Sequence, residues 1–225
     1  MTILSRRNLF GQALPAVALA AIGGTAAYRA MSSPDASDAP SFPATPVSAR
    51  TRLQQQHLPN ISLVTHEGKS VRLYDDLVKD KVVTLNFFYT GCTDICPTVT
   101  ANLAAAQVLL GDQVGRDIFM YSFTLNPDWD DVDAIRKYRE SFKAGPGWTF
   151  LTGKRDDLEQ LRKAIGFRLP DPAKDQDKEQ HIGNIRYGNE PRMLWAACPG
   201  MAHPSYIAET LTWMIRPDTS RIQPA

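Results

Sequence analysis

Two cysteines, Cys92 and Cys96, are separated by three residues in the segment Gly-Cys-Thr-Asp-Ile-Cys-Pro. They follow an apolar run at residues 82–89 and precede an Ala- and Leu-rich stretch at residues 101–110 that is typical of a helix. The N-terminus of a helix carries partial positive charge, which favours a thiolate over a thiol. Paired thiolates in that place can exchange with disulfides or bind a soft metal such as copper or zinc.

The elements that must position these thiols alternate between strands and helices. Strands are predicted at residues 61–65, 70–73, 82–89, 118–125, 149–151, 181–187 and 192–196, and helices at 97–110, 130–142, 156–165 and 206–215. Turn residues at 66–69 and 188–190 predict two hairpins. This order favours an α/β fold with a central mixed, largely parallel sheet, flanking helices and an inserted β-hairpin. The two cysteines then lie at the C-terminal end of a central strand, where functional groups gather in open α/β sheets.

The charge of the chain is close to neutral. It has 25 Lys and Arg against 24 Asp and Glu, a formal net charge of +1. Removal of residues 1–27 would change this to −1, because Arg6 and Arg7 are the charged residues in that stretch. The charges are mixed along the chain without a basic block, so we expect no nucleic-acid partner.

The first 27 residues have the pattern of an export signal. Arg6 and Arg7 precede Asn-Leu-Phe and a short apolar stretch that ends in small residues. Adjacent arginines of this kind indicate the twin-arginine route, which leads to the periplasm. The alternative is an uncleaved anchor that holds the protein in the inner membrane, facing the periplasm.

Three further regions are predicted after the signal. Residues 28–57 contain four prolines among Ser, Ala and Asp, a composition typical of a linker. Residues 58–217 have the size of one domain, and residues 218–225 form a short C-terminal tail.

The sequence resembles the Sco/SenC family of copper-binding thioredoxin-like proteins. The resemblance is carried by residues 85–97, 124–127 and 148–153, and by His181 with the hairpin that follows it. It covers most of the predicted domain and implies a thioredoxin-like fold. Thr93 stands where the family commonly has Pro, and Asn126 where it often has Asp. Neither difference removes a metal ligand.

The resemblance implies that Cys92, Cys96 and His181 bind copper. It also implies a role in assembling the CuA centre of cytochrome c oxidase, as copper donor, thiol reductant or both. The partners would be the oxidase subunit that carries CuA, or other copper and thiol chaperones. Two thiolates and one imidazole are a donor set that suits Cu(I) or Cu(II).

Two alternatives concern the function of Cys92 and Cys96. The first is a periplasmic thiol–disulfide oxidoreductase with a redox-active dithiol and no physiological metal. The second is a structural disulfide, which we expect less because the strand-to-helix turn should be exposed. A peroxidase of the peroxiredoxin type does not fit, because Pro97 and Thr100 follow the cysteines instead of preceding them.

A second group of soft ligands is Cys198, Met201 and His203. Their spacing suggests another metal site, but a semi-buried cysteine with a methionine filling core space is the preferred interpretation.

Overall fold

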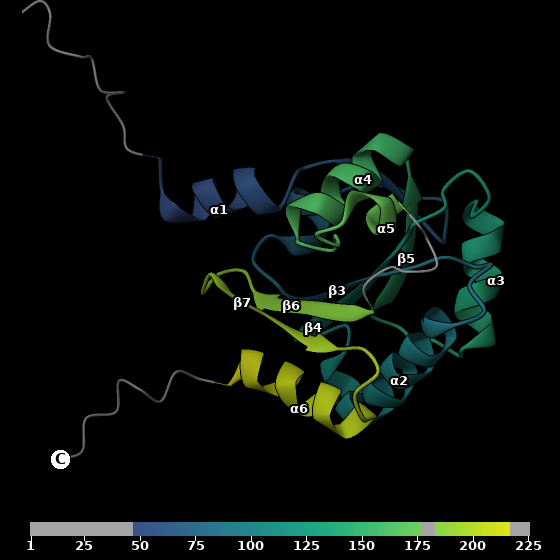
Figure 1. Ribbon diagram of the computed structural model, residues 1–225. Coiled ribbons are helices and arrows are strands. Elements are labelled where there is room, and N and C mark those ends of the chain that lie inside the picture. The colour runs from purple at the N-terminus through teal and green to yellow at the C-terminus, as the bar shows by residue number, and fades with distance from the viewer. Residues whose placement is uncertain (1–46, 177–182, 217–225) are drawn as a thin grey trace, which may run out of the picture. The chain divides into compact units, whose positions relative to one another are not determined.

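The computed structural model describes residues 47–176 and 183–216 (Figure 1). The predicted signal, most of the predicted linker, His181 and the C-terminal tail lie outside these residues. In the described part of the chain, seven strands form one sheet in the order β2-β1-β5-β4-β3-β6-β7. The strands are β1 (Ser62–Thr65), β2 (Ser70–Arg72), β3 (Val82–Phe88), β4 (Ile118–Thr124), β5 (Trp148–Gly153), β6 (Asn184–Asn189) and β7 (Leu194–Pro199).

The centre of the sheet is parallel. Strand β4 pairs in parallel with both β3 and β5, whereas the pairs β1–β2, β1–β5, β3–β6 and β6–β7 are antiparallel. The predicted α/β class and mixed sheet with a parallel centre are therefore confirmed. Antiparallel strands extend this centre on both sides because hairpins need only short connections.

Helices cover both faces of the sheet (Figure 1). They are α1 (Ala49–His57), α2 (Ile95–Leu110), α3 (Val132–Ser141), α4 (Arg155–Ala164), α5 (Pro172–Gln176) and α6 (Pro204–Ile215), with a π-helical turn at Leu73–Val78 and a 3₁₀ turn at Gly111–Gln113. None of the helices in the described residues is long and apolar enough to cross a membrane.

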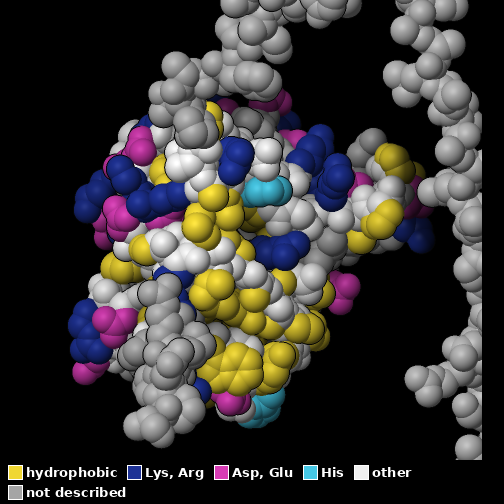
Figure 2. All heavy atoms as spheres, turned by 90° about the vertical axis from the view of Figure 1, so that its left-hand side faces the viewer, with side chains coloured by type: hydrophobic (Ala, Val, Ile, Leu, Met, Phe, Trp, Pro, Cys, Tyr) yellow, Lys and Arg dark blue, Asp and Glu magenta, His cyan; other side chains and the backbone are white. Residues whose placement is uncertain are grey.

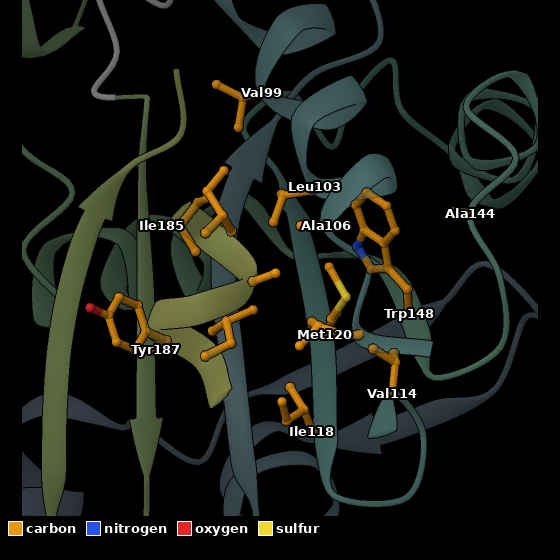
Figure 3. Close-up of a cluster of buried hydrophobic side chains, with 14 of the residues drawn as sticks. Val99, Leu103, Ala106, Val114, Ile118, Met120, Ala144, Trp148, Ile185 and Tyr187 are labelled. Carbon is orange, nitrogen blue, oxygen red and sulfur yellow. The ribbon is translucent and has the colours of Figure 1, made fainter. Parts of the chain in front are cut away.

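Strand β3 separates two hydrophobic cores, because successive side chains of a strand point to opposite faces. Val83, Leu85 and Phe87 pack on the face covered by α4. Val82 and Phe88 pack on the other face, with α2 and α6. Figure 3 shows this second core, which joins α2 to β4, β5 and β6 through the side chains Val99, Leu103, Ala106, Met120, Trp148 and Ile185.

Several element boundaries differ from the sequence-based predictions. Helix α2 begins at Ile95, so Cys96 lies inside its first turn. Helix α3 begins at Val132 instead of residue 130, because Asp131 caps it and accepts a hydrogen bond from the Ala134 N–H at 2.8 Å. The turn of the second hairpin falls after β6, which includes Asn189, and is not centred on residues 188–190 as predicted.

Helix α1 occupies the last residues of the predicted linker. None of its side chains is buried, so hydrophobic burial alone does not explain its position. Arg50 anchors it, because the guanidinium donates to both carboxylate oxygens of Glu190 at 2.7 and 2.6 Å. This contact joins residues that are 140 positions apart, which no local pattern reveals.

Strand β7 is an edge strand of the described sheet and carries apolar residues on its surface. Leu194 is 44% exposed, and Trp213 of the nearby helix α6 is 52% exposed. Figure 2 views the side of the molecule where β7 begins and α6 ends in Figure 1, and shows hydrophobic side chains gathered between Lys and Arg side chains.

Candidate metal centre

The two cysteines lie between the end of β3 and the first turn of α2. The Cys92 N–H donates to the carbonyl oxygen of Tyr89 at 3.2 Å, which turns the chain just after the strand. Cys92 is 6% exposed and Cys96 is 2% exposed. The expectation of an exposed turn is therefore wrong for the thiols, because the backbone faces solvent while both side chains turn inward.

The sulfur of Cys92 occupies the capping position of helix α2. It accepts a hydrogen bond from the Cys96 N–H at 3.5 Å, whereas Asp94, at the N-cap, makes no capping bond with its side chain. Burial alone would raise the pKa of Cys92. Hydrogen bonds from the Cys96 thiol and from the Cys96 and Asp94 N–H groups outweigh burial, and the pKa lies below its ordinary value.

The pKa of Cys96 shifts in the opposite direction, above its ordinary value. Burial raises its pKa, and the hydrogen bond to Cys92 raises it further, because that bond holds the proton on Cys96. The pair therefore combines one sulfur that ionises easily with one that keeps its proton. Such a pair can attack a disulfide through Cys92 and complete the exchange through Cys96.

A hydroxyl pair supports the first turn of α2. The Thr100 hydroxyl donates to the Cys96 carbonyl oxygen at 2.8 Å and lies 3.0 Å from the Tyr138 hydroxyl. Tyr138 also stacks on Phe88 at the end of β3, with ring centroids 4.9 Å apart. In the helix predicted at residues 130–142, Tyr138 is spaced with Val132 and Ile135 on one buried face, which predicts only a packing role. Its hydroxyl contact depends on how α3 and α2 meet.

The third predicted ligand, His181, lies outside the described residues. The next described residue is Gly183. A Cβ atom added to this glycine would lie 2.3 Å from Ile95 Cδ1, so Gly183 and Ile95 are in close contact. Ile95 directly precedes Cys96. Within residues 47–176 and 183–216, no three His, Cys, Asp or Glu side chains are grouped to hold a metal.

The other three histidines are engaged elsewhere. His57 Nδ1 lies 3.1 Å from the Ala164 carbonyl oxygen, and His66 Nδ1 accepts the Phe150 N–H at 3.3 Å. His203 caps α6 and accepts the Ser205 N–H at 3.3 Å.

Cys198, Met201 and His203 do not form a second metal site. Cys198 is 2% exposed in the core, where the Thr210 hydroxyl points to its sulfur at 4.0 Å. Burial raises the pKa of Cys198. Met201 is 54% exposed, so it does not fill the core as expected. The buried cysteine agrees with the preferred interpretation, and the methionine does not.

Comparisons with known proteins agree with this architecture. Residues 49–215 match the SCO1/SenC family. "Protein sco1" of Schizosaccharomyces pombe is 30% identical over 125 residues, which cover 53% of this chain and 46% of that protein. The chain spans about half the length of the curated relatives it matches.

Solved structures of similar fold include copper-bound ScoI of Arabidopsis thaliana. It is 22% identical, with a TM-score of 0.55, and the match covers 69% of this chain and 95% of that one. Another is BsSco, described as a member of the Sco family of cytochrome c oxidase assembly proteins with a disulfide switch. It is also 22% identical, with a TM-score of 0.55, over 68% of this chain and 90% of that one. These likenesses confirm the thioredoxin-like fold of the Sco structures. Since the family match runs from α1 to the end of α6, the chain belongs to the SCO1/SenC family.

Proposed function

We propose that this protein binds copper through Cys92, Cys96 and His181, and that it assists assembly of the CuA centre of cytochrome c oxidase as metallochaperone, thiol reductant or both. The observation that carries the proposal is the buried pair of thiols at the start of α2, where Gly183 contacts Ile95. Gly183 follows His181 by two residues, and two residues span at most about 7 Å. The contact between Gly183 and Ile95 therefore supports a place for His181 within reach of the thiols.

Two thiolates and one imidazole suit copper as an ion that the protein binds and delivers. Thiolates are soft ligands that select Cu(I), and an imidazole suits both copper oxidation states. The lowered pKa of Cys92 assists binding, because a thiol must lose its proton to become a ligand. Burial of both sulfurs limits access of water and oxidants to the bound ion.

The family membership supports the partner. A relative of the same fold is described as a cytochrome c oxidase assembly protein, and another is known with copper bound. We infer that the partner of this chain is the oxidase subunit that carries CuA, or another copper or thiol chaperone.

Copper titration of the reduced full chain tests the metal site. One Cu(I) per chain is expected, and pre-oxidation to the Cys92–Cys96 disulfide should abolish uptake because both sulfurs are then bonded. His181→Ala should retain Cu(I) on two thiolates but change the absorption and EPR spectra with Cu(II). His57→Ala is the matched control, because His57 contacts Ala164 instead. Unchanged Cu(II) spectra in His181→Ala would refute the assignment of His181.

We further propose export to the periplasm by the twin-arginine route. The support is the pair Arg6 and Arg7 before a short apolar stretch. Replacement of both by Lys should leave the precursor in the cytoplasm, measured by fractionation of cells. Unimpaired export of the double-Lys variant would assign the protein to the general secretory route.

The asymmetry of the two thiols favours a second candidate, a thiol–disulfide oxidoreductase without a physiological metal. A sulfur with lowered pKa beside one with raised pKa is suited to disulfide exchange. The two candidates differ in their need for His181. If His181→Ala keeps full activity in oxidase assembly and Cys92→Ser loses that activity, the protein acts as a thiol–disulfide oxidoreductase without a physiological metal.

A further inference from the structure

Asp130 is a buried carboxyl group close to the thiol loop, defined here as residues 90–94. Its side chain is 0% exposed, although it lies outside the regular elements, between β4 and α3. A buried acidic side chain needs hydrogen-bond donors to compensate for the loss of water. Among the described residues, Asp130 forms no ion pair with a basic side chain, so its partners are neutral groups.

These partners lie at the ends of two adjacent central strands. The Thr90 N–H donates to Asp130 Oδ2 at 3.2 Å, and the Thr90 hydroxyl donates to Oδ1. The Thr124 hydroxyl, at the end of β4, donates to Oδ2. The carboxyl group therefore joins the residue that opens the thiol loop to the last residue of β4.

Thr90 donates two of the three bonds, one from its backbone N–H and one from its side-chain hydroxyl. A β-branched residue held in this way has both its backbone and its χ1 angle restricted. Thr90 precedes Cys92 by two residues, and the Cys92 sulfur must reach the N-terminus of α2 to accept the Cys96 N–H. A shift of Thr90 would displace this sulfur from its capping position.

We propose that Asp130 is a positioning residue for Cys92: through Thr90 it holds the thiol loop so that the Cys92 sulfur caps helix α2. This inference rests on the proposed dithiol function. It extends that function to a residue on another loop, 38 positions further along the chain. The charge of Asp130 also reaches the site. Burial chiefly raises the pKa of Tyr138, and the charge of Asp130 adds to the effect.

The test measures the reduction potential of the Cys92–Cys96 disulfide in the full chain, in a Cys198→Ser background. Dithiothreitol gives two electrons and two protons to the protein disulfide and closes to its own cyclic disulfide. The capped Cys92 sulfur stabilises the reduced protein. Asp130→Ala should therefore shift this equilibrium about tenfold toward the oxidised protein, which is a potential about 30 mV more negative.

Three further variants separate positioning from stability. Thr90→Val removes a hydroxyl bond on the thiol side of Asp130, and Thr124→Val removes one on the β4 side. Both should lower the urea midpoint similarly, but only Thr90→Val should shift the potential. Asp130→Asn should restore most of the wild-type potential. Its amide oxygen can accept from the Thr90 N–H while its amide nitrogen donates to the Thr90 hydroxyl.

Equal shifts of potential in Thr90→Val and Thr124→Val, or no shift in either, would overturn the proposal and leave Asp130 a structural residue. If Asp130→Ala does not fold, the two threonine variants decide alone. The potential is measured without metal, so it separates this inference from the copper proposal. A wild-type chain that binds no copper but shows the expected shifts refutes only the copper proposal. Normal copper binding with unchanged potentials refutes only the role of Asp130.

Discussion

Gly183 lies so close to Ile95 that a Cβ atom added to Gly183 would stand 2.3 Å from Ile95 Cδ1 and 3.0 Å from Cγ1. Real Cβ atoms do not approach other heavy atoms at the shorter of these distances. The lack of a side chain at Gly183 therefore lets the chain after His181 approach the first turn of α2, beside Cys96.

This contact predicts a role for side-chain size at position 183. Gly183→Val should push the start of β6 away from α2 and weaken binding of Cu(II) through His181, with a smaller effect on Cu(I). The measurement is a competition titration followed by absorption and EPR spectra. Adding Ile95→Ala should recover part of the lost affinity, because it removes the atoms in contact. Wild-type Cu(II) binding by Gly183→Val alone would contradict the prediction.

Cys198 is expected to take no part in copper or redox chemistry. It is buried in the core and burial raises its pKa, so its thiol should react slowly in the folded protein. A Cys198→Ser chain should keep full copper stoichiometry and the same reducible disulfide. A thiol count and copper analysis of the oxidised, reduced and variant proteins measure this. Loss of copper in Cys198→Ser would make Cys198 a ligand.

Glu190 is expected to make the folded state sensitive to acid. Its buried carboxylate accepts hydrogen bonds from Arg50, from the Tyr74 hydroxyl at 2.8 Å and from the Asp80 N–H at 2.9 Å. Burial alone would raise the pKa of Glu190, but the bond from Arg50 and those from Asp80 and Tyr74 outweigh burial and lower it.

A lowered pKa in the folded state stabilises the protein above the ordinary glutamate pKa of about 4.3, and this stabilisation is lost as the pH falls through the folded-state pKa. Glu190→Gln should cost about 1 to 3 kcal/mol at pH 7 and flatten the dependence of unfolding free energy on pH below about 4. Asp133→Asn is the control, because the Arg136–Asp133 pair is on the surface and the Asp133 side chain is 71% exposed. Parallel pH curves for wild type and Glu190→Gln would disprove the assignment.

Two tryptophans should differ sharply in their effect on stability. Trp148 is 1% exposed and its indole N–H donates to the Ser122 hydroxyl at 2.9 Å, so Trp148→Ala should cost about 3 to 5 kcal/mol. Trp129 is 80% exposed, and Trp129→Ala should change the unfolding free energy by about 0.5 kcal/mol or less. Urea denaturation followed by circular dichroism compares the two. A loss of more than about 2 kcal/mol of unfolding free energy in Trp129→Ala would show that the Trp129 side chain packs against the rest of the protein.

Most of the local elements, and the position of the paired thiols before a helix, can be predicted from the sequence alone. The continuous apolar run of β3 predicts a strand buried on both faces, and the paired cysteines before an Ala-rich stretch predict thiols at the start of a helix. These signals are local, because periodicity and helix propensity depend on neighbours within a few residues. The family and its fold were recognisable for the same reason.

Which distant groups meet cannot be predicted from local sequence and is seen first in the folded protein. The burial of Cys92 and Cys96, the pairing of Arg50 with Glu190 and the approach of Gly183 to Ile95 join separate parts of the chain. The bonds that Thr90 donates to Asp130 likewise depend on two parallel strands ending at the same edge. Each of these contacts depends on where the helices and loops lie against the sheet. That packing is a property of the whole chain, and no short segment encodes it.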